Sequence, residues 1–468
     1  MHPFIKTFLY LTACGMSGLS ACASLPESSP VLITPKAHAV KFEDKQGPVS
    51  AKKGASIIET IKSEAGSSDI LQKHLALEEA INRDSPLVLG NRLVLLQDGP
   101  ATYKAMFAAI RAAQDHINLE TYIFEDGEIG TQFADLLLEK QASGVQVNII
   151  YDSVGCLNTP EEFFERLSAG GIQLLEYNPV NPAKENQKEW LLNNRDHRKL
   201  LVVDGKVAFL GGINISESYS AGSGGHFSRS RSKKTTKKEV GWRDTHLQIQ
   251  GPAVAEFQKY FMETWTDQKG PALATRHYFP ELDTKGDEIV RAIGSKSDVP
   301  ESPIYLTLLS AIEHADRHIH LTNAYFVPDQ RLLKALMDAA QRGVDVEIIL
   351  PGKTDSWIVF HAGRSHYAEL LDAGVKLYER RDAVLHSKTA TIDGVWSTIG
   401  STNLDWRSFL HNDEINAVIL GAEFSQQMNA MFTKDRSVSH PILVEEWKRR
   451  PLLLRFKEWL AVRFEYWL

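Results

Sequence analysis

Histidine and lysine stand two residues apart at two places in this chain, and each pair is followed by aspartate and glycine. His197 and Lys199 belong to residues 197–205, HRKLLVVDG, and His386 and Lys388 belong to residues 386–394, HSKTATIDG. Both segments have the form H-x-K-x4-D-G. Residues i and i+2 of a β-strand point to the same face, so each strand would place an imidazole beside an ammonium group.

Two such pairs suit chemistry at a phosphodiester. One neutral imidazole can attack phosphorus while the other, protonated, gives a proton to the departing oxygen, and two ammonium groups neutralise the phosphate. A metal ion needs ligands gathered around it, and a cationic lysine two positions from each histidine opposes cation binding. We therefore expect no metal and no other cofactor at these residues.

The competing interpretation is that each histidine is a hydrogen-bonded core residue, which is the commoner role of a single histidine on an apolar strand. The duplication favours catalysis. Gly211 and Asn214 follow the first histidine at the same distances at which Gly400 and Asn403 follow the second. Packing alone gives no reason for two matched copies.

One carboxylate per half, Asp244 and Glu414, lies further along and could hold a histidine nitrogen and set its tautomer. The motif aspartates, next to glycine, are expected to hold turns more than to take part in the reaction. The candidate catalytic residues are His197, Lys199, Asp204, His386, Lys388 and Asp393. The candidate phosphate-binding or orienting residues are Asn214, Asn403, Asp244 and Glu414.

The motifs lie in two related halves. At an offset of 202, eight residues between Tyr103 and Phe124 recur between Tyr305 and Phe326. In each half, helix-period segments (105–113 and 130–140, then 308–315 and 332–340) precede apolar strands, the second of which ends near Asp152 or Pro351. This alternation predicts helices packed on a sheet. Two long repeats predict two similar domains face to face, with a site between them.

Composition limits the class of protein. The chain has 468 residues, enough for two or three domains, with 43% hydrophobic and 24% charged residues, which are ordinary globular values. Its three cysteines, Cys14, Cys22 and Cys156, offer neither an internal disulfide framework nor a cysteine zinc cluster. A net charge of −7 argues against bulk nucleic-acid binding by a basic surface.

The first 22 residues have the layout of an export signal. Lys6 precedes an apolar run that is too short to span a membrane, and residues 19–22, LSAC, resemble the lipobox of bacterial lipoproteins. Cys22 is then the expected lipidation site, with ordinary secretory cleavage or an uncleaved anchor as the alternatives. We expect a lipid-anchored, membrane-associated protein facing the periplasm of a bacterium, at either membrane. Residues 23–89 are expected to form a mostly irregular tether with a helix over 70–81.

The duplicated motif resembles the signature of the phospholipase D superfamily, and within it the chain is similar to bacterial cardiolipin synthases. The similarity runs from about Asn91 to the C-terminus and includes residues 120–130, 242–246, 323–328 and 400–405. With the repeat, it predicts an α/β fold of two similar phospholipase D-like domains, each a mostly parallel sheet flanked by helices, packed with pseudo-two-fold symmetry around one shared site. The expected domains are residues 90–280 and 281–435, followed by a helical segment, 436–468.

The resemblance implies a phosphatidyltransferase that moves a phosphatidyl group between phospholipids, such as phosphatidylglycerol, through a covalent phosphohistidine. It points to His197 as the nucleophile and His386 as the general acid, although the motifs alone leave this choice open. Phospholipid hydrolysis and, less favoured, nuclease activity are the alternatives, because only the acceptor or substrate changes. No nucleic-acid partner is expected. Two features differ from the family pattern: typical members begin with transmembrane helices, and Ser216 stands where the second half has Asp405.

Two further segments point towards a membrane surface. Residues 220–240 form an insertion with six basic residues, which is interpreted either as a solvated charge run or as a contact with anionic headgroups. Residues 447–468 mix aromatic and basic residues. This second segment predicts either an amphipathic interfacial helix or, favoured here, a helix that covers the second domain.

Overall fold

A computed structural model describes residues 40–66, 68–181, 193–232, 235–297, 299 and 302–467, without the side chains of residues 228–238, 466 and 467. The predicted signal peptide, with Cys22, and the first part of the predicted tether lie outside the described residues. So do the side chains of the basic insertion. Within the described residues no helix combines the length and the apolar character needed to cross a bilayer.

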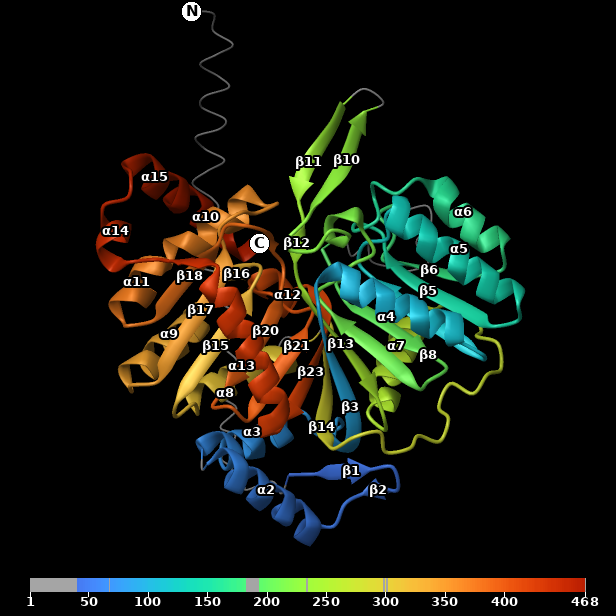
Figure 1. Ribbon diagram of the computed structural model, residues 1–468, viewed down its shortest axis with the longest axis horizontal. Coiled ribbons are helices and arrows are strands. Elements are labelled where there is room, and N and C mark those ends of the chain that lie inside the picture. The colour runs from blue at the N-terminus through green and yellow to red at the C-terminus, as the bar shows by residue number, and fades with distance from the viewer. Residues whose placement is uncertain are drawn as a thin grey trace, which may run out of the picture. The chain divides into compact units, whose positions relative to one another are not determined.

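The first half of the chain builds seven strands of a mixed sheet (Figure 1). Their spatial order is β6 (Gln173–Tyr177), β5 (Gln146–Asp152), β4 (His116–Thr121), β8 (Lys199–Val203), β9 (Val207–Gly211), β13 (Thr245–Gln250) and β3 (Leu87–Gln97). β4, β5 and β6 run parallel, whereas every other neighbouring pair is antiparallel.

The second half repeats this order. Its strands are β18 (Lys376–Arg380), β17 (Asp345–Pro351), β15 (His318–Asn323), β20 (Lys388–Ile392), β21 (Trp396–Gly400), β23 (Asn412–Leu420) and β14 (Glu288–Ser295), with β24 (Ser439–Pro441) on the outer edge of β18. The half-sheets join where β14 pairs antiparallel with β3, with Val290 opposite Val88. The predicted two similar units with pseudo-two-fold symmetry are thus confirmed, as one continuous sheet.

The expected predominance of parallel strands is wrong. Parallel neighbours need a crossover, and in the first half only β4 to β5 and β5 to β6 are connected through helices that lie on the sheet. β8 and β9 instead form a hairpin closed at Asp204 and Gly205, both of which have positive φ. A short turn forces antiparallel pairing, and the same hairpin recurs at β20 and β21.

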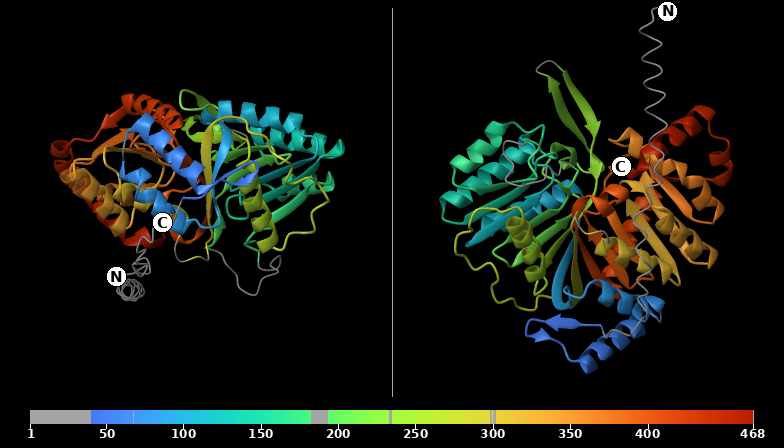
Figure 2. Two further views of the ribbon diagram at one scale, coloured as in Figure 1. Left: turned by 90° about the horizontal axis from the view of Figure 1, so that it is seen from below. Right: turned by 180° about the vertical axis from the view of Figure 1, so that it is seen from behind.

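Helices cover both faces of the sheet (Figures 1 and 2). In the first half they are α4 (Asp98–Ala112), α5 (Glu128–Ala142), α6 (Glu161–Ala169) and α7 (Val254–Asp267). In the second they are α8 (Pro303–Glu313), α9 (Gln330–Gln341), α10 (Trp357–Ser365), α11 (Tyr367–Asp372), α12 (Trp406–Leu410) and α13 (Ala422–Ser437). The four predicted helical segments fall on α4, α5, α8 and α9, although the first runs one residue past the end of α4 and the third two residues past the end of α8. β5 and β17 end at Asp152 and Pro351 as predicted.

The apolar core explains why the halves form one body. One cluster lies between α4, α5, α6 and one face of the first half-sheet, around Phe133 and Ile149. A second cluster lies on the other face and crosses the junction, since Phe257 of α7 and Leu210 of β9 belong to it together with Ile415 of β23. Burial of this shared apolar surface stabilises the junction beneath the site.

The expectation of a mostly irregular tether over residues 23–89 is wrong for much of its described part. That part contains β1 (Phe42–Asp44), β2 (Gly47–Pro48), α2 (Ala51–Ala65), the 3-10 turn η1 (Asp69–Leu71) and α3 (His74–Ile81). These elements lie at the bottom of the sheet in Figure 1 and in the right view of Figure 2. The buried carboxylate of Glu78 pairs with Arg291 at 3.2 Å and accepts a hydrogen bond from Trp396 Nε1 at 3.0 Å. The face of α3 that contacts the sheet is partly polar, so the spacing of apolar residues did not predict that this segment packs against the sheet.

Two segments complete the fold on the opposite side. β10 (His226–Ser232) and β11 (Thr235–Val240) form an antiparallel hairpin that projects upwards in Figure 1. Near the C-terminus lie α14 (Val444–Lys448), α15 (Leu452–Ala461) and the 3-10 helix η4 (Val462–Trp467). α15 and η4 pack against α10 of the second half.

Candidate active site

Each motif histidine is held by the backbone of the other half. β7 (Arg195–Asp196) pairs with the start of β23, and the His197 N–H donates to the Asp413 carbonyl at 2.9 Å. In the same way β12 (Trp242–Arg243) pairs with β19 (Val384–Leu385), and the His386 N–H donates to the Arg243 carbonyl at 2.8 Å. Neither half can therefore form its histidine site alone.

The orienting carboxylates are exchanged between the halves. Glu414 of the second half contacts His197 Nδ1 at 3.0 and 3.1 Å, and Asp244 of the first half contacts His386 Nδ1 at 2.8 Å. Each imidazole donates its Nδ1–H to a carboxylate, which leaves Nε2 available for phosphorus. The sequence indicated both carboxylates but not this exchange.

Both histidines line one pocket at the junction, with about 930 Å³ of open space. Asn214 and Asn403 line it as well, so the structure brings together the matched residues of both motifs. Its aromatic wall consists of Tyr122, Tyr219, Trp242 and Tyr325. His197 and His386 are only 7% and 5% exposed, so a phosphate must enter the pocket to reach either imidazole.

The motif lysines lie behind the histidines and are not part of the pocket lining. Lys199 Nζ donates to the His197 carbonyl, and Lys388 Nζ donates to the His386 carbonyl at 2.6 Å. Burial lowers the pKa of Lys199 to about 7 and that of Lys388 to about 8. Lys388 Nζ also lies 3.1 Å from His386 Nδ1, so this lysine contacts the imidazole directly.

The two histidines have different electrostatic surroundings. Burial lowers the pKa of His197 well below its usual value, and Lys199, Lys388, His386 and Arg407 lower it further. Burial and Lys388 also lower the pKa of His386, but the Asp244 carboxylate opposes this shift. Both imidazoles therefore have lowered pKa values, and the Asp244 carboxylate limits the lowering at His386.

The two asparagines are also used differently. Asn214 Oδ1 accepts from the Ile123 N–H at 3.1 Å, and its Nδ2 donates to the Tyr219 hydroxyl at 3.1 Å. Asn403 Oδ1 is buried and has no hydrogen-bond partner among the described residues.

The aspartates of the motif do not line the pocket, so their inclusion among the candidate catalytic residues stays a prediction. Asp204 accepts from the backbone N–H groups of residues 114–116 at 2.8–3.2 Å. Asp393 accepts from those of residues 316–318 at 2.8–3.1 Å. Each closes the far end of a strand that carries a histidine at its near end, which is the turn-holding role expected for them.

Several pocket residues were missed by sequence reasoning. Tyr219 places its hydroxyl 3.2 Å from His386 Nδ1, and the Trp242 and His386 ring centroids are 5.1 Å apart. Asp355 and Arg407 also line the pocket, and Asp405, noted only as a difference between the halves, joins them with a pKa raised by burial to about 7. Trp242 precedes Arg243 and Asp244 in the chain, and this adjacency was the one available signal.

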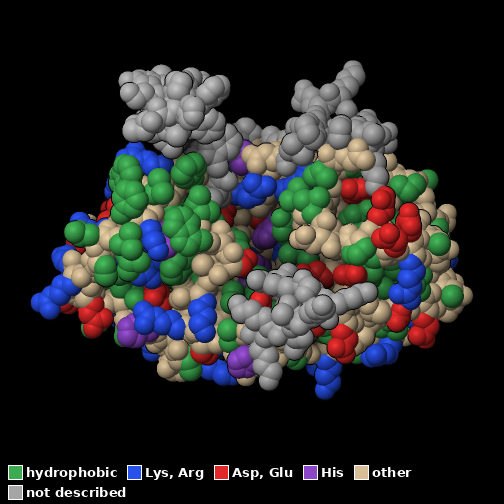
Figure 3. All heavy atoms as spheres, turned by 90° about the horizontal axis from the view of Figure 1, so that it is seen from above, with side chains coloured by type: hydrophobic (Ala, Val, Ile, Leu, Met, Phe, Trp, Pro, Cys, Tyr) green, Lys and Arg blue, Asp and Glu red, His purple; other side chains and the backbone are tan. Residues whose placement is uncertain are grey.

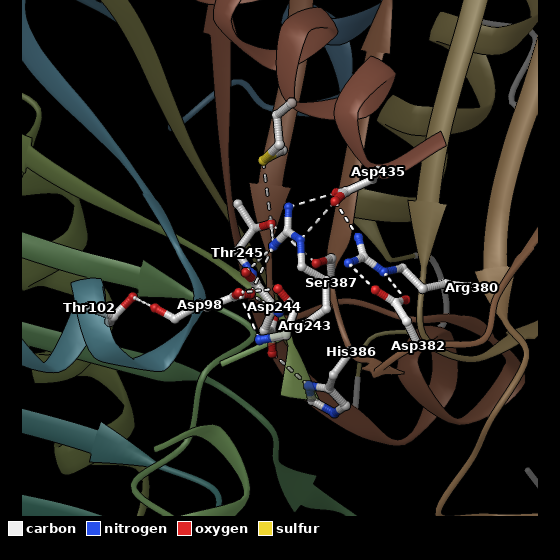
Figure 4. Close-up of polar contacts among 12 residues, drawn as sticks. Asp98, Thr102, Arg243, Asp244, Thr245, Arg380, Asp382, His386, Ser387 and Asp435 are labelled. Atoms are coloured by element: carbon white, nitrogen blue, oxygen red, sulfur yellow. Dashed lines mark hydrogen bonds and ion pairs between the residues drawn. The ribbon is translucent and has the colours of Figure 1, made fainter. Parts of the chain in front are cut away.

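A buried ion-pair network supports the Asp244 side of the site (Figure 4). Arg243 donates from Nε and Nη2 to Asp435 at 3.0 and 2.7 Å, and Arg380 donates to the same carboxylate. Asp98 accepts from the Asp244 N–H at 3.1 Å. The loop that presents Asp244 to His386 is thus clamped from both halves.

The chain is similar in sequence to known proteins. A family model described as "Cardiolipin synthase, PLD-like domain" matches residues 106–240 and 308–436. A cardiolipin synthase of Geobacillus kaustophilus is 36% identical over 377 residues, 80% of this chain and 72% of the relative. A cardiolipin synthase 2 of Bacillus anthracis is 33% identical over 366 residues, 78% of this chain and 68% of that relative.

Among solved structures, a phosphatidylserine synthase of Haemophilus influenzae has a similar fold. The TM-score is 0.57 at 14% sequence identity, over 84% of this chain and 99% of that one. The family model and the relatives each match both motif-bearing halves. The chain therefore belongs to the phospholipase D-like family of cardiolipin synthases.

Proposed function

We propose that this protein is a phosphatidyltransferase that makes cardiolipin from phosphatidylglycerol and a second phospholipid. One observation carries the proposal: His197 and His386 line a single pocket, each with Nδ1 held by a carboxylate of the opposite half. A one-histidine site could supply either a nucleophile or an acid, whereas this arrangement supplies both on one phosphorus.

In the first step, His197 Nε2 attacks the phosphorus of the donor phospholipid. A P–N bond forms, the P–O bond to the head alcohol breaks, and His386 gives its Nε2 proton to the departing oxygen. Glu414 stabilises the positive charge that develops on His197, and the lysine charges stabilise the phosphate oxygens. The depressed pKa of His197 supports its role as the neutral nucleophile.

In the second step, the hydroxyl of an acceptor lipid attacks the phosphohistidine. His386 takes the hydroxyl proton, the new P–O bond forms, the P–N bond breaks and His197 returns to its neutral state. Water in place of the lipid hydroxyl would give phosphatidic acid, so hydrolysis and transfer share every residue and differ only in the acceptor.

The proposal is tested by extracting lipids from cells that express the wild-type chain or the His197→Ala variant. Cardiolipin that rises with the wild type and not with the variant is the expected result. Phosphatidic acid without cardiolipin would show that the protein hydrolyses phospholipids and does not transfer the phosphatidyl group. DNA cleavage without lipid turnover would overturn the assignment of a lipid substrate. Protein incubated with phosphatidylglycerol labelled in its phosphate and denatured under alkaline conditions, which preserve the P–N bond, should carry the label on residue 197 only.

We further propose that the chain acts at a bacterial membrane, anchored through Cys22 and facing the periplasm. The support is the sequence pattern of the first 22 residues. Labelled palmitate should enter the wild type and not the Cys22→Ser variant. Label in both proteins, or in neither, would contradict the anchor.

A further inference from the structure

α15 is turned so that its apolar side faces outwards. Glu458 and Ala461 are its buried residues, whereas Leu452, Leu453, Phe456 and Trp459 are 77%, 65%, 57% and 51% exposed. Leu460 and, in η4, Phe464 are exposed as well. A helix that covers a core shows the reverse pattern, so the expectation that this segment covers the second domain with its apolar face is wrong.

The orientation is held by buried charge. Glu458 accepts from Arg450 Nε at 2.9 Å and lies 3.8 Å from Arg364 Nε. The guanidinium groups of Arg364 and Arg450 lie 4.7 and 4.4 Å from the ring of the buried Trp447. Turning the apolar side inwards would take the Glu458 carboxylate away from the Arg450 guanidinium, which is strongly unfavourable for a buried pair. The outward apolar face is therefore built into the fold.

Basic side chains accompany the exposed apolar ones. Arg455 on α15 and Arg463 on η4 are exposed, and the Arg463 guanidinium lies 5.1 Å from the Trp459 ring centroid. Arg449 precedes the helix and is exposed as well. Aromatic, aliphatic and basic residues on one exposed face match the boundary between headgroups and acyl chains of an anionic bilayer.

The patch is continuous with the wall of the active-site pocket. α10 packs against α15 and η4, and Val359 of α10 lines the pocket. Trp357, 48% exposed at the start of α10, extends the apolar surface beyond α15. Figure 3 shows hydrophobic and basic side chains gathered on the second-half side of a central hollow. The β10–β11 hairpin projects on this same side of the sheet (Figures 1 and 2).

We propose that the exposed face of α15 and η4 is a docking surface for an anionic phospholipid bilayer, which brings the pocket mouth to the headgroups. The inference rests on the proposed function, because a lipid substrate has to be drawn from such a bilayer. An acyl anchor at the N-terminus would hold the chain near the membrane without orienting the pocket, whereas this face orients it.

The test measures binding to vesicles of phosphatidylglycerol and phosphatidylcholine by flotation. Every protein is the full chain with Cys22→Ser and His197→Ala, so neither acylation nor turnover contributes. Phe456→Gln is compared with Phe279→Gln, the same exchange at a 52% exposed phenylalanine between α7 and β14. We expect Phe456→Gln to weaken binding about tenfold, from the apolar area withdrawn from the bilayer, and Phe279→Gln to leave it unchanged.

Charge is tested with Arg455→Gln/Arg463→Gln, which should weaken binding to anionic vesicles by about tenfold or more and leave binding to pure phosphatidylcholine unaltered. With His197 restored, turnover of a dissolved short-chain phosphatidylglycerol should be the same in Phe456→Gln as in the parent. Vesicle binding that all these variants leave intact would overturn the proposal, as would a dimer that Phe456→Gln converts to a monomer. Failure of the proposed function would instead show as absent lipid turnover with normal vesicle binding.

Discussion

Replacing Asp244 with Asn tests whether the exchanged carboxylate sets the protonation of His386. The exchange keeps the size of the side chain and removes the charge that lies 2.8 Å from His386 Nδ1. Asp244 opposes the lowering of the His386 pKa by burial and by Lys388. The pKa of His386 must therefore fall in the variant, and the imidazole must lose its proton at lower pH.

The expected size follows from the strength of the lost bond. A hydrogen bond to a charged group contributes about 1.5–3 kcal/mol, which corresponds to a pKa about 1–2 units lower at 1.36 kcal/mol per unit. If the departing oxygen takes its proton from His386, kcat/KM at pH 7 falls about 10- to 100-fold, since the acid form becomes that much rarer.

The assay combines kcat/KM between pH 5 and 9 with an NMR titration of the imidazole of His386. The titration is needed because Lys199 and Lys388, with pKa values of about 7 and 8, also lose protons in this range. Glu414→Gln is the matched control: it should slow the reaction through His197 and leave the titration of His386 in place. Asp244→Asn with kcat/KM within threefold of wild type and an unmoved titration would refute this account of the site.

Three further changes separate chemistry from stability. Arg407→Gln removes a positive charge that lowers the pKa of His197, so that pKa should rise. The acidic limb of the pH profile of kcat/KM should then move to higher pH. An acidic limb that stays in place or moves to lower pH would contradict this. Asp204→Asn should lower the free energy of unfolding by about 1–3 kcal/mol, measured in urea, with kcat of the folded protein within threefold; lost kcat at full stability would mean a catalytic role. Asp435→Asn removes the negative charge of the buried carboxylate that Arg243 contacts, and should lower the free energy of unfolding by about 3–5 kcal/mol. A decrease below about 1 kcal/mol would contradict the role given to this ion-pair network.

Local spacing made much of the site predictable. Residues two positions apart cannot separate far, so each motif histidine had to lie near its lysine, although β8 and β20 begin at the lysines and the histidines precede them. The aspartate-glycine turns were readable for the same reason, because a left-handed turn conformation is a property of a few adjacent residues. The repeat predicted two similar units because each copy carries its own set of helix and strand signals.

The pairing of strands that are distant in the sequence could not be predicted from local spacing. Whether Glu414 meets His197 or His386 depends on β7 pairing with β23, which lies more than two hundred residues further along the chain. The same holds for the aromatic pocket wall, for the folded part of the expected tether and for the outward face of α15. In the last two cases the buried contacts involve ion pairs, and apolar periodicity carries no information about them.

The sequence by itself determined that two histidine–lysine pairs exist, one in each of two related halves, with asparagine and glycine at matched distances. Only the tertiary structure decided that one continuous sheet joins the halves, that each half orients the other's histidine and that the lysines lie behind the pocket wall. The physical reason is range: backbone geometry relates residues a few positions apart, whereas long-range pairing and burial are set by the packing of the whole chain.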